Sequence, residues 1–71
     1  MSDMAKLRGR IAEKGMTQQI LAEKTSMDRS TLNRKLKTGD TFTIGEAVRL
    51  ARALNLSKDD VAAIFFTDIV A

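Results

Sequence analysis

The chain has 71 residues, of which 44% are hydrophobic and 30% are charged, so it can fold around one small core and has no room for a second domain. It contains neither cysteine nor histidine, which excludes disulfides, thiolate catalysis and the usual general bases and zinc ligands. No apolar run approaches the roughly 18 residues of a membrane span. We therefore expect a cytoplasmic protein with no catalytic residue, no metal and no cofactor.

The net charge is +3, from 12 Lys and Arg against 9 Asp and Glu, and it is unevenly distributed. Residues 1–39 carry nine basic side chains against four acidic ones, whereas residues 57–71 carry one against three. A basic surface attracts polyanions, but the same imbalance is common on a solvated surface. For Lys6, Arg8 and Arg10 we expect the solvated face of an amphipathic helix.

The absence of proline and the helical spacing of the apolar residues predict an all-α fold, a compact bundle of five short helices. In the first helix Met4, Leu7 and Ile11 share one face, and Gly15 is a suitable left-handed stop. The expected helices cover about residues 3–14, 17–25, 28–37, 43–54 and 57–65.

Capping signals predict where the later helices begin. Thr17, Asp28 and Ser57 stand where an N-cap side chain accepts a hydrogen bond from the first turn. Thr43 and Glu46 have the spacing of a capping box, in which each side chain bonds the other residue's backbone amide. The fourth helix should be the central core element, because it carries a wide apolar face formed by Ala47, Val48, Leu50, Ala51 and Leu54.

The second and third helices have the features of a helix-turn-helix unit, in which the second helix of the pair enters the DNA major groove. Ala22 provides a small residue where the two helices cross, and Met27 and Leu32 provide apolar residues after the turn. Through residues 17–24 and 28–34 the chain resembles the lambda-repressor-like, Cro-type helix-turn-helix family. The resemblance extends from about residue 6 to residue 64, and it is greatest for small phage-encoded regulators.

Two residues depart from the pattern of that family. Ser26 stands in the turn where the family usually has glycine, and a positive φ there would cost serine about 1 kcal/mol. The alternative is that the turn is built differently. Lys35 stands at an aliphatic position of the recognition helix, so that Leu36 is expected to take over its place in the core.

A helical wheel of the third helix predicts which side chains face DNA. Leu32 and Leu36 define the inward side, which leaves Arg34 on the opposite side and Asn33 on a flank. Arg34 has the donor fork that pairs with guanine, and Asn33 is suited to adenine. The family correspondence adds Arg29, in the first turn. The predicted base-contacting residues are Arg29, Ser30, Asn33 and Arg34, with a solvated helix surface as the alternative.

Binding a duplex also requires anchoring to phosphate, for which helix N-termini supply backbone amides. The resemblance assigns such a contact to Gln18, at the start of the second helix. We add Thr17, Lys37, Thr38 and Thr41 from their expected position on the same rim, although Thr17 also serves as an N-cap.

Three classes of function could account for these sequence features. The leading one is a sequence-specific transcriptional regulator that binds double-stranded DNA, a phage- or prophage-type repressor in a prokaryotic or phage-infected cell, without a small-molecule effector. The alternative is a helical protein-interaction module whose basic face binds an acidic partner. An enzyme is the least favoured, because Asp59 and Asp60, the closest pair of carboxylates, lie at a helix start where capping explains them.

The C-terminal residues 64–70 carry more apolar surface than a solvated tail should expose. Ile64 and one phenylalanine are expected to complete the core. Phe66, Ile69 and Val70 suit a two-fold contact between copies, and a homodimer would read a palindromic operator with two recognition helices. The alternative is that the tail folds back on its own core.

Overall fold

A computed structural model of the chain describes residues 3–39 and 42–66. Within these ranges the regular elements are all α helices, which confirms the expected fold, and each observed boundary lies within one residue of the predicted one. The helices are α1 (Met4–Glu13), α2 (Gln18–Thr25), α3 (Arg29–Thr38), α4 (Ile44–Leu54) and α5 (Lys58–Phe65).

The N-caps predicted from the sequence are all present. The Thr17 hydroxyl accepts a hydrogen bond from the backbone amide of Ile20 at 3.1 Å. Asp28 caps α3 and Ser57 caps α5 in the same way. Thr43 and Glu46 form the complete capping box at the start of α4. These local hydrogen bonds satisfy backbone amides that have no partner within their own helix, so they fix where each helix begins.

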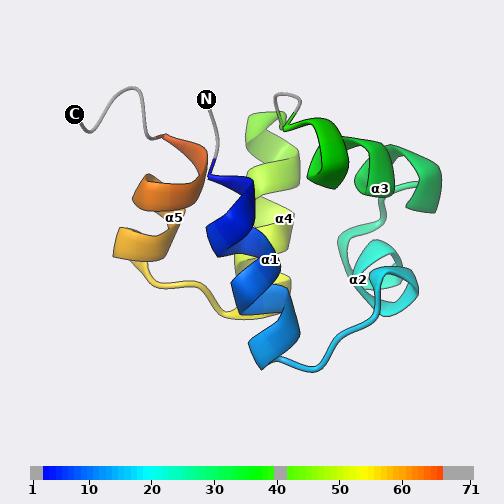
Figure 1. The fold of residues 1–71 in the computed structure, drawn as a ribbon, viewed down its shortest axis with the longest axis horizontal. Coiled ribbons are helices and arrows are strands. Elements are labelled where there is room, and N and C mark those ends of the chain that lie inside the picture. Colours follow the sequence, from blue (N-terminus) through cyan, green and yellow to red (C-terminus); the bar gives the residue numbers. More distant parts are fainter. Residues whose placement is uncertain (1–2, 40–41, 67–71) are drawn as a thin grey trace.

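Figure 1 shows how the five helices are arranged. α4 packs against α2 on one side and α5 on the other, while α1 contacts α3 and α5. α2 and α3 also contact each other across the short turn that joins them. The helix pair α2–α3 therefore lies at one end of the molecule and α5 at the other, along a longest dimension of 32 Å.

All five helices contribute to one core. Leu7, Leu21, Leu32, Leu50 and Ile64 are fully buried, one from each helix. Phe65 packs against this core, and its ring meets that of Phe42 edge to face with centroids 5.7 Å apart. This confirms that Ile64 and one phenylalanine complete the core.

The expected apolar face of α4 was too wide. Ala47, Leu50 and Leu54 are buried, but Val48 is 42% exposed. Val48 lies one turn after Ile44, which is 76% exposed at the start of the helix. Both residues occupy the outward side of α4, because the neighbouring helices cover only a narrower arc of its surface.

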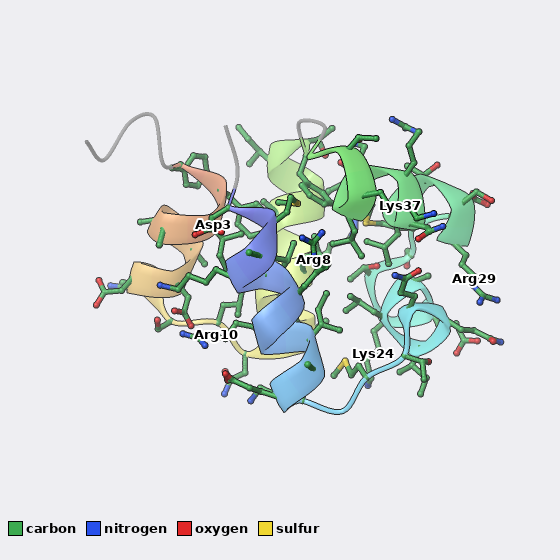
Figure 2. The ribbon with its side chains drawn as sticks, viewed as in Figure 1. Asp3, Arg8, Arg10, Lys24, Arg29 and Lys37 are labelled. Atoms are coloured by element: carbon green, nitrogen blue, oxygen red, sulfur yellow. The ribbon has the colours of Figure 1, made fainter. Side chains whose placement is uncertain are left out.

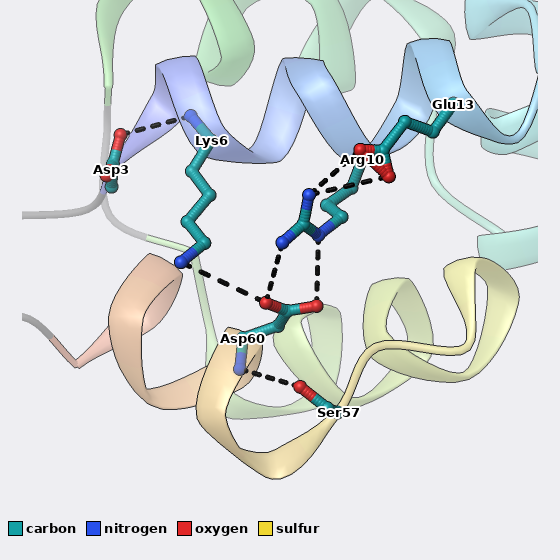
Figure 3. A network of polar contacts seen from close by, with 6 residues as sticks. All are labelled: Asp3, Lys6, Arg10, Glu13, Ser57 and Asp60. Atoms are coloured by element: carbon teal, nitrogen blue, oxygen red, sulfur yellow. Dashed lines mark hydrogen bonds and ion pairs between the residues drawn. The ribbon is translucent and has the colours of Figure 1, made fainter.

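A polar network joins α1 to α5, as Figure 3 shows. The Arg10 guanidinium donates to both carboxylate oxygens of Asp60, at 3.0 and 3.1 Å, and also pairs with Glu13. Lys6 lies 4.0 Å from Asp60. The hydrogen bond from Arg10 holds the pKa of Asp60 below its ordinary value. The expectation that Lys6 and Arg10 are merely solvated was therefore wrong, because a carboxylate distant in the sequence lies beside them.

Among the described residues, no helix has the length and apolar character needed to cross a membrane.

Candidate DNA-binding surface

The turn between α2 and α3 is built from close backbone contacts. Ala22 is 5% exposed, and its carbonyl accepts the amide of Met27 at 3.0 Å. The Thr25 side chain is fully buried, and its hydroxyl donates to the Leu21 carbonyl at 2.7 Å. Ser26, which stands at the position of the usual glycine, adopts the left-handed conformation with φ of 55°, so the turn keeps a positive φ at this residue. A small residue at position 22 therefore stands where the turn folds back on α2, as predicted.

The outer side of α3 carries the residues predicted to contact bases. Leu32 and Leu36 face inward, at 0% and 2% exposure. Arg29, Ser30 and Arg34 are exposed, and Asn33 is half-buried on the flank. Figure 2 shows Arg29 extending away from the body of the protein at the start of α3. Its place in the first turn keeps it outside the packed side of the helix, as expected. All four side chains thus stand on one helix.

The residues predicted to contact phosphate lie near the ends of α2 and α3. Thr17 and Gln18 are exposed at the start of α2, and Lys37 is exposed in the last turn of α3. The Thr38 hydroxyl donates to the carbonyl of Arg34 at 2.9 Å. Thr41 lies outside the described residues. The described residues of this set therefore form two groups, Thr17 and Gln18 at the start of α2 and Lys37 and Thr38 at the end of α3.

Lys35 is the residue whose role the sequence did not predict. Lys35 occupies the position where the family has an aliphatic residue, and it is buried there, at 8% exposure, although it is a cation. Leu36 is buried beside it. Its ammonium donates to the Glu46 carboxylate at 2.6 Å and lies 5.6 Å from the centroid of the Phe42 ring. α3 is thus joined to the first turn of α4 by an ion pair that is nearly buried, with side-chain exposures of 11% and 13%.

Glu46 serves two partners with one oxygen. Oε1 accepts both the Lys35 ammonium and the backbone amide of Thr43, the latter at 2.8 Å. Burial alone would raise the pKa of Glu46, but the hydrogen bonds from Lys35 and Thr43 outweigh burial and lower it. The carboxylate is therefore ionised at neutral pH, and it joins α3 to the first turn of α4.

A second contact fixes the end of α3. The Arg8 guanidinium, on α1, donates to the Leu36 carbonyl at 2.7 Å, one of the carbonyls near the end of α3 that lack a helical partner. Arg8 is exposed, as expected for the solvated face of α1, but its guanidinium also has this backbone partner, which the sequence did not predict. Lys35 of α3 bonds Glu46 on α4, and Arg8 of α1 bonds the Leu36 carbonyl of α3, so cations from two helices help to fix α3 on the domain.

The family of Cro/C1-type HTH DNA-binding domains matches residues 6–65. The chain belongs to this family, which confirms the resemblance read from its helix-turn-helix residues. No curated protein and no solved structure is significantly similar to it. With α2 and α3 as the helix-turn-helix, the protein is a DNA-binding domain of the regulatory type.

Proposed function

We propose that the protein is a transcriptional repressor of phage or prophage type that occupies an operator by placing α3 in the DNA major groove. The observation that carries this proposal is the division of α3 into two sides. Leu32, Lys35 and Leu36 are buried against the domain, while the opposite side presents residues suited to base edges.

The exposed side chains have distinct roles in this proposal. Arg34 pairs in bidentate fashion with O6 and N7 of a guanine, and Asn33 reads an adenine. The Ser30 hydroxyl can accept or donate a hydrogen bond, so it is compatible with several bases. Arg29 reaches past the start of the helix to a base at the edge of the site. These four contacts specify sequence, whereas contacts to phosphate fix position.

Phosphate anchoring comes from the ends of the two helices. Gln18 and the first amides of α2 face one strand, and Lys37 follows the exposed side of α3. The Thr17 oxygen accepts from Ile20, but its hydroxyl proton is available to a phosphate. Thr38 must turn its hydroxyl away from the Arg34 carbonyl to do the same. Thr41 would add a contact from the loop before α4.

We further propose that the repressor binds a palindromic operator as a homodimer and without a small-molecule effector. One recognition helix reads only a few base pairs, so two copies separated by about 34 Å along the duplex give a usable site. Phe66, Ile69 and Val70 are the proposed contacts between copies. Of these, Phe66 lies in the described residues, where it is 36% exposed.

Selection from a random duplex pool, followed by mobility shift, tests this function. We expect enrichment of one two-fold symmetric sequence, bound at least about 1,000-fold more tightly than random duplex at the same salt concentration. Equal affinity for selected and random duplexes would contradict sequence-specific regulation. Enrichment of an asymmetric site would support sequence-specific DNA recognition but contradict the proposed palindromic operator.

A further inference from the structure

A second cationic surface lies between the later parts of α2 and α4. Lys24, Arg49, Arg52 and Ala53 line an open depression there, with a volume of about 420 Å³. Three of these four residues are cations, and no acidic residue of the described chain lines the depression. Positive charge is thus concentrated in a concave surface that contains no counter-charge of its own.

Some of the other cations of the described residues are paired with carboxylates. Arg10 and Lys6 share Asp60, and Lys35 is bound by Glu46. By contrast, the side chains of Lys24 and Arg52 form no hydrogen bond or ion pair with another described residue. Like charges held near one another repel, so an anion that enters the depression relieves this repulsion.

Arg49 is held in place for such a contact. Its Nε donates to the carbonyl of Thr25, the last residue of α2, at 2.7 Å. Its Nη1 lies over Gly45, where an added Cβ would be 3.4 Å away. A guanidinium that is already oriented loses less conformational entropy when it binds a carboxylate.

The depression lies at the opposite ends of the helices from the proposed phosphate contacts. Lys24 follows Gln18 by six residues, about 9 Å along α2. Arg52 follows the start of α4 at Ile44 by eight residues, about 12 Å. Because the N-terminal ends of these helices lie toward the operator in the proposed complex, the ligand of the depression is a different molecule.

The shape and surroundings indicate the class of that ligand. A small molecule is usually enclosed by its site, whereas this depression is open. Ile20, one helical turn before Lys24 on the same side of α2, is 42% exposed and provides an apolar edge. We propose that Lys24, Arg49 and Arg52 form a docking site for an acidic, partly apolar segment of a partner protein. This inference goes beyond the proposed repressor function, and it rests on that function only in taking DNA to lie at the other ends of α2 and α4.

A fluorescent synthetic peptide of Glu and Leu residues is the probe, with binding measured by anisotropy and mapped by backbone amide chemical shifts. The double variant K24E/R52E should weaken binding about tenfold. K14E/K58E is the matched control, because it makes the same change in charge at two exposed residues outside the depression. It should weaken binding less than about twofold. Arg49 is left unchanged because it bonds the end of α2.

Three results would overturn the proposal. Equal weakening by both double variants would show that only net charge matters. Chemical shift changes centred on α3 would place the peptide on the DNA-binding side. Displacement of the peptide by an equimolar duplex or by millimolar inorganic phosphate would assign the depression to DNA or to a small anion. The peptide experiment contains no operator DNA, so its result does not depend on whether the protein recognises an operator. Failure to bind the peptide would likewise leave the proposed repressor function unaffected.

Discussion

Ser26 carries a backbone conformation that glycine would adopt without steric cost. It ends α2 with φ of 55°, in the left-handed region, where a side chain costs about 1–2 kcal/mol. We predict that Ser26→Gly raises the free energy of unfolding by about 0.5–1 kcal/mol, because the relief of strain exceeds the entropy that glycine adds to the unfolded chain. Urea unfolding followed by circular dichroism measures this change.

Asn55→Gly is the matched control for that prediction. Asn55 ends α4 with a similar φ of 52°, but asparagine tolerates this region better than serine does. The gain at residue 55 should therefore be smaller than the gain at residue 26. If both variants gain equally, or if Ser26→Gly gains nothing, strain in the helix-turn-helix is not a determinant of stability.

Arg34 should discriminate between sequences. Because Arg34→Ala removes the proposed bidentate base contact, we predict a loss of about 1–3 kcal/mol in binding to the selected operator, with little change in binding to random duplex. Mobility shift at one salt concentration, with both duplexes, measures the difference. Equal losses on the two duplexes would reassign Arg34 to the phosphate backbone.

Lys37 should act differently although it lies on the same helix. The phosphate contact proposed for Lys37 carries no sequence information, so Lys37→Ala should weaken binding to operator and random duplex alike. The slope of log K against log salt should fall by about one counterion. A slope that does not change with the substitution would mean that Lys37 is ordinary solvated surface.

At the scale of elements, the Lys35–Glu46 ion pair joins α3 to the first turn of α4. Lys35→Met keeps most of the volume but leaves the nearly buried Glu46 without its cation, so we predict a loss of about 2–3 kcal/mol in the free energy of unfolding. The double variant K35M/E46Q should regain part of this loss, because glutamine is neutral and still completes the capping box. Urea unfolding of the two variants tests this.

A double variant less stable than Lys35→Met alone would contradict that account of the ion pair. Lys37→Ala is a second control, since Lys37 is exposed on the same helix. It should change stability by less than about 0.5 kcal/mol.

The helices could be predicted from the sequence because their signals are local. Thr17, Asp28 and Thr43 act within three residues of their own positions, and the spacing of apolar residues fixes the buried side of each helix. The exposure of Val48 could not be predicted in this way, because it depends on how much of α4 its neighbours cover. Contacts that decide exposure are made between elements, not within them.

The candidate site was likewise predictable only in part. Leu32 and Leu36 were sufficient to place Arg34 on the outer side of α3. The partner of Lys35, however, is eleven residues away on another helix, and the carbonyl bonded by Arg8 is 28 residues away. From the sequence alone, a charged side chain at these positions is expected to face solvent or a polyanion. The sequence does not show which carboxylates and carbonyls the fold brings beside it.

At the scale of the whole molecule, two carboxylates join different helices, Asp60 joining α5 to α1 and Glu46 joining α4 to α3, and both make stability depend on pH. Hydrogen bonds from Arg10 lower the pKa of Asp60, and hydrogen bonds from Lys35 and Thr43 lower that of Glu46 against the effect of burial. Both groups therefore stabilise the fold above their unfolded pKa values of about 4. This contribution is lost as the pH falls through the lower pKa values of the folded state.

We predict that the free energy of unfolding is nearly constant from about pH 5 to pH 7 and declines below about pH 4. Asp60→Asn and Glu46→Gln should each make that decline shallower, and their combination shallower still. Urea unfolding at a series of pH values measures the slopes. Unchanged slopes in both variants would show that other carboxylates control acid unfolding.

Phe66 connects the fold to the proposed assembly. It follows Phe65, which packs against the core, yet it is itself 36% exposed at the end of α5. α5 lies at the opposite end of the molecule from α2 and α3 (Figure 1), so a contact between copies there leaves both recognition helices available. We predict that the protein is a dimer at DNA-binding concentrations and that Phe66→Asp makes it a monomer with the fold retained, as measured by sedimentation equilibrium and circular dichroism.

Ile20→Asp is the control for the dimer, because it places the same charge on another exposed apolar residue, 42% exposed on α2. It should leave the dimer intact. Loss of the dimer should weaken binding to a palindromic operator much more than binding to a single half-site, because only the palindrome engages two copies at once. A wild-type protein that is a monomer in solution and binds the palindrome as a single copy would defeat the dimer hypothesis while leaving half-site recognition by α3 in place.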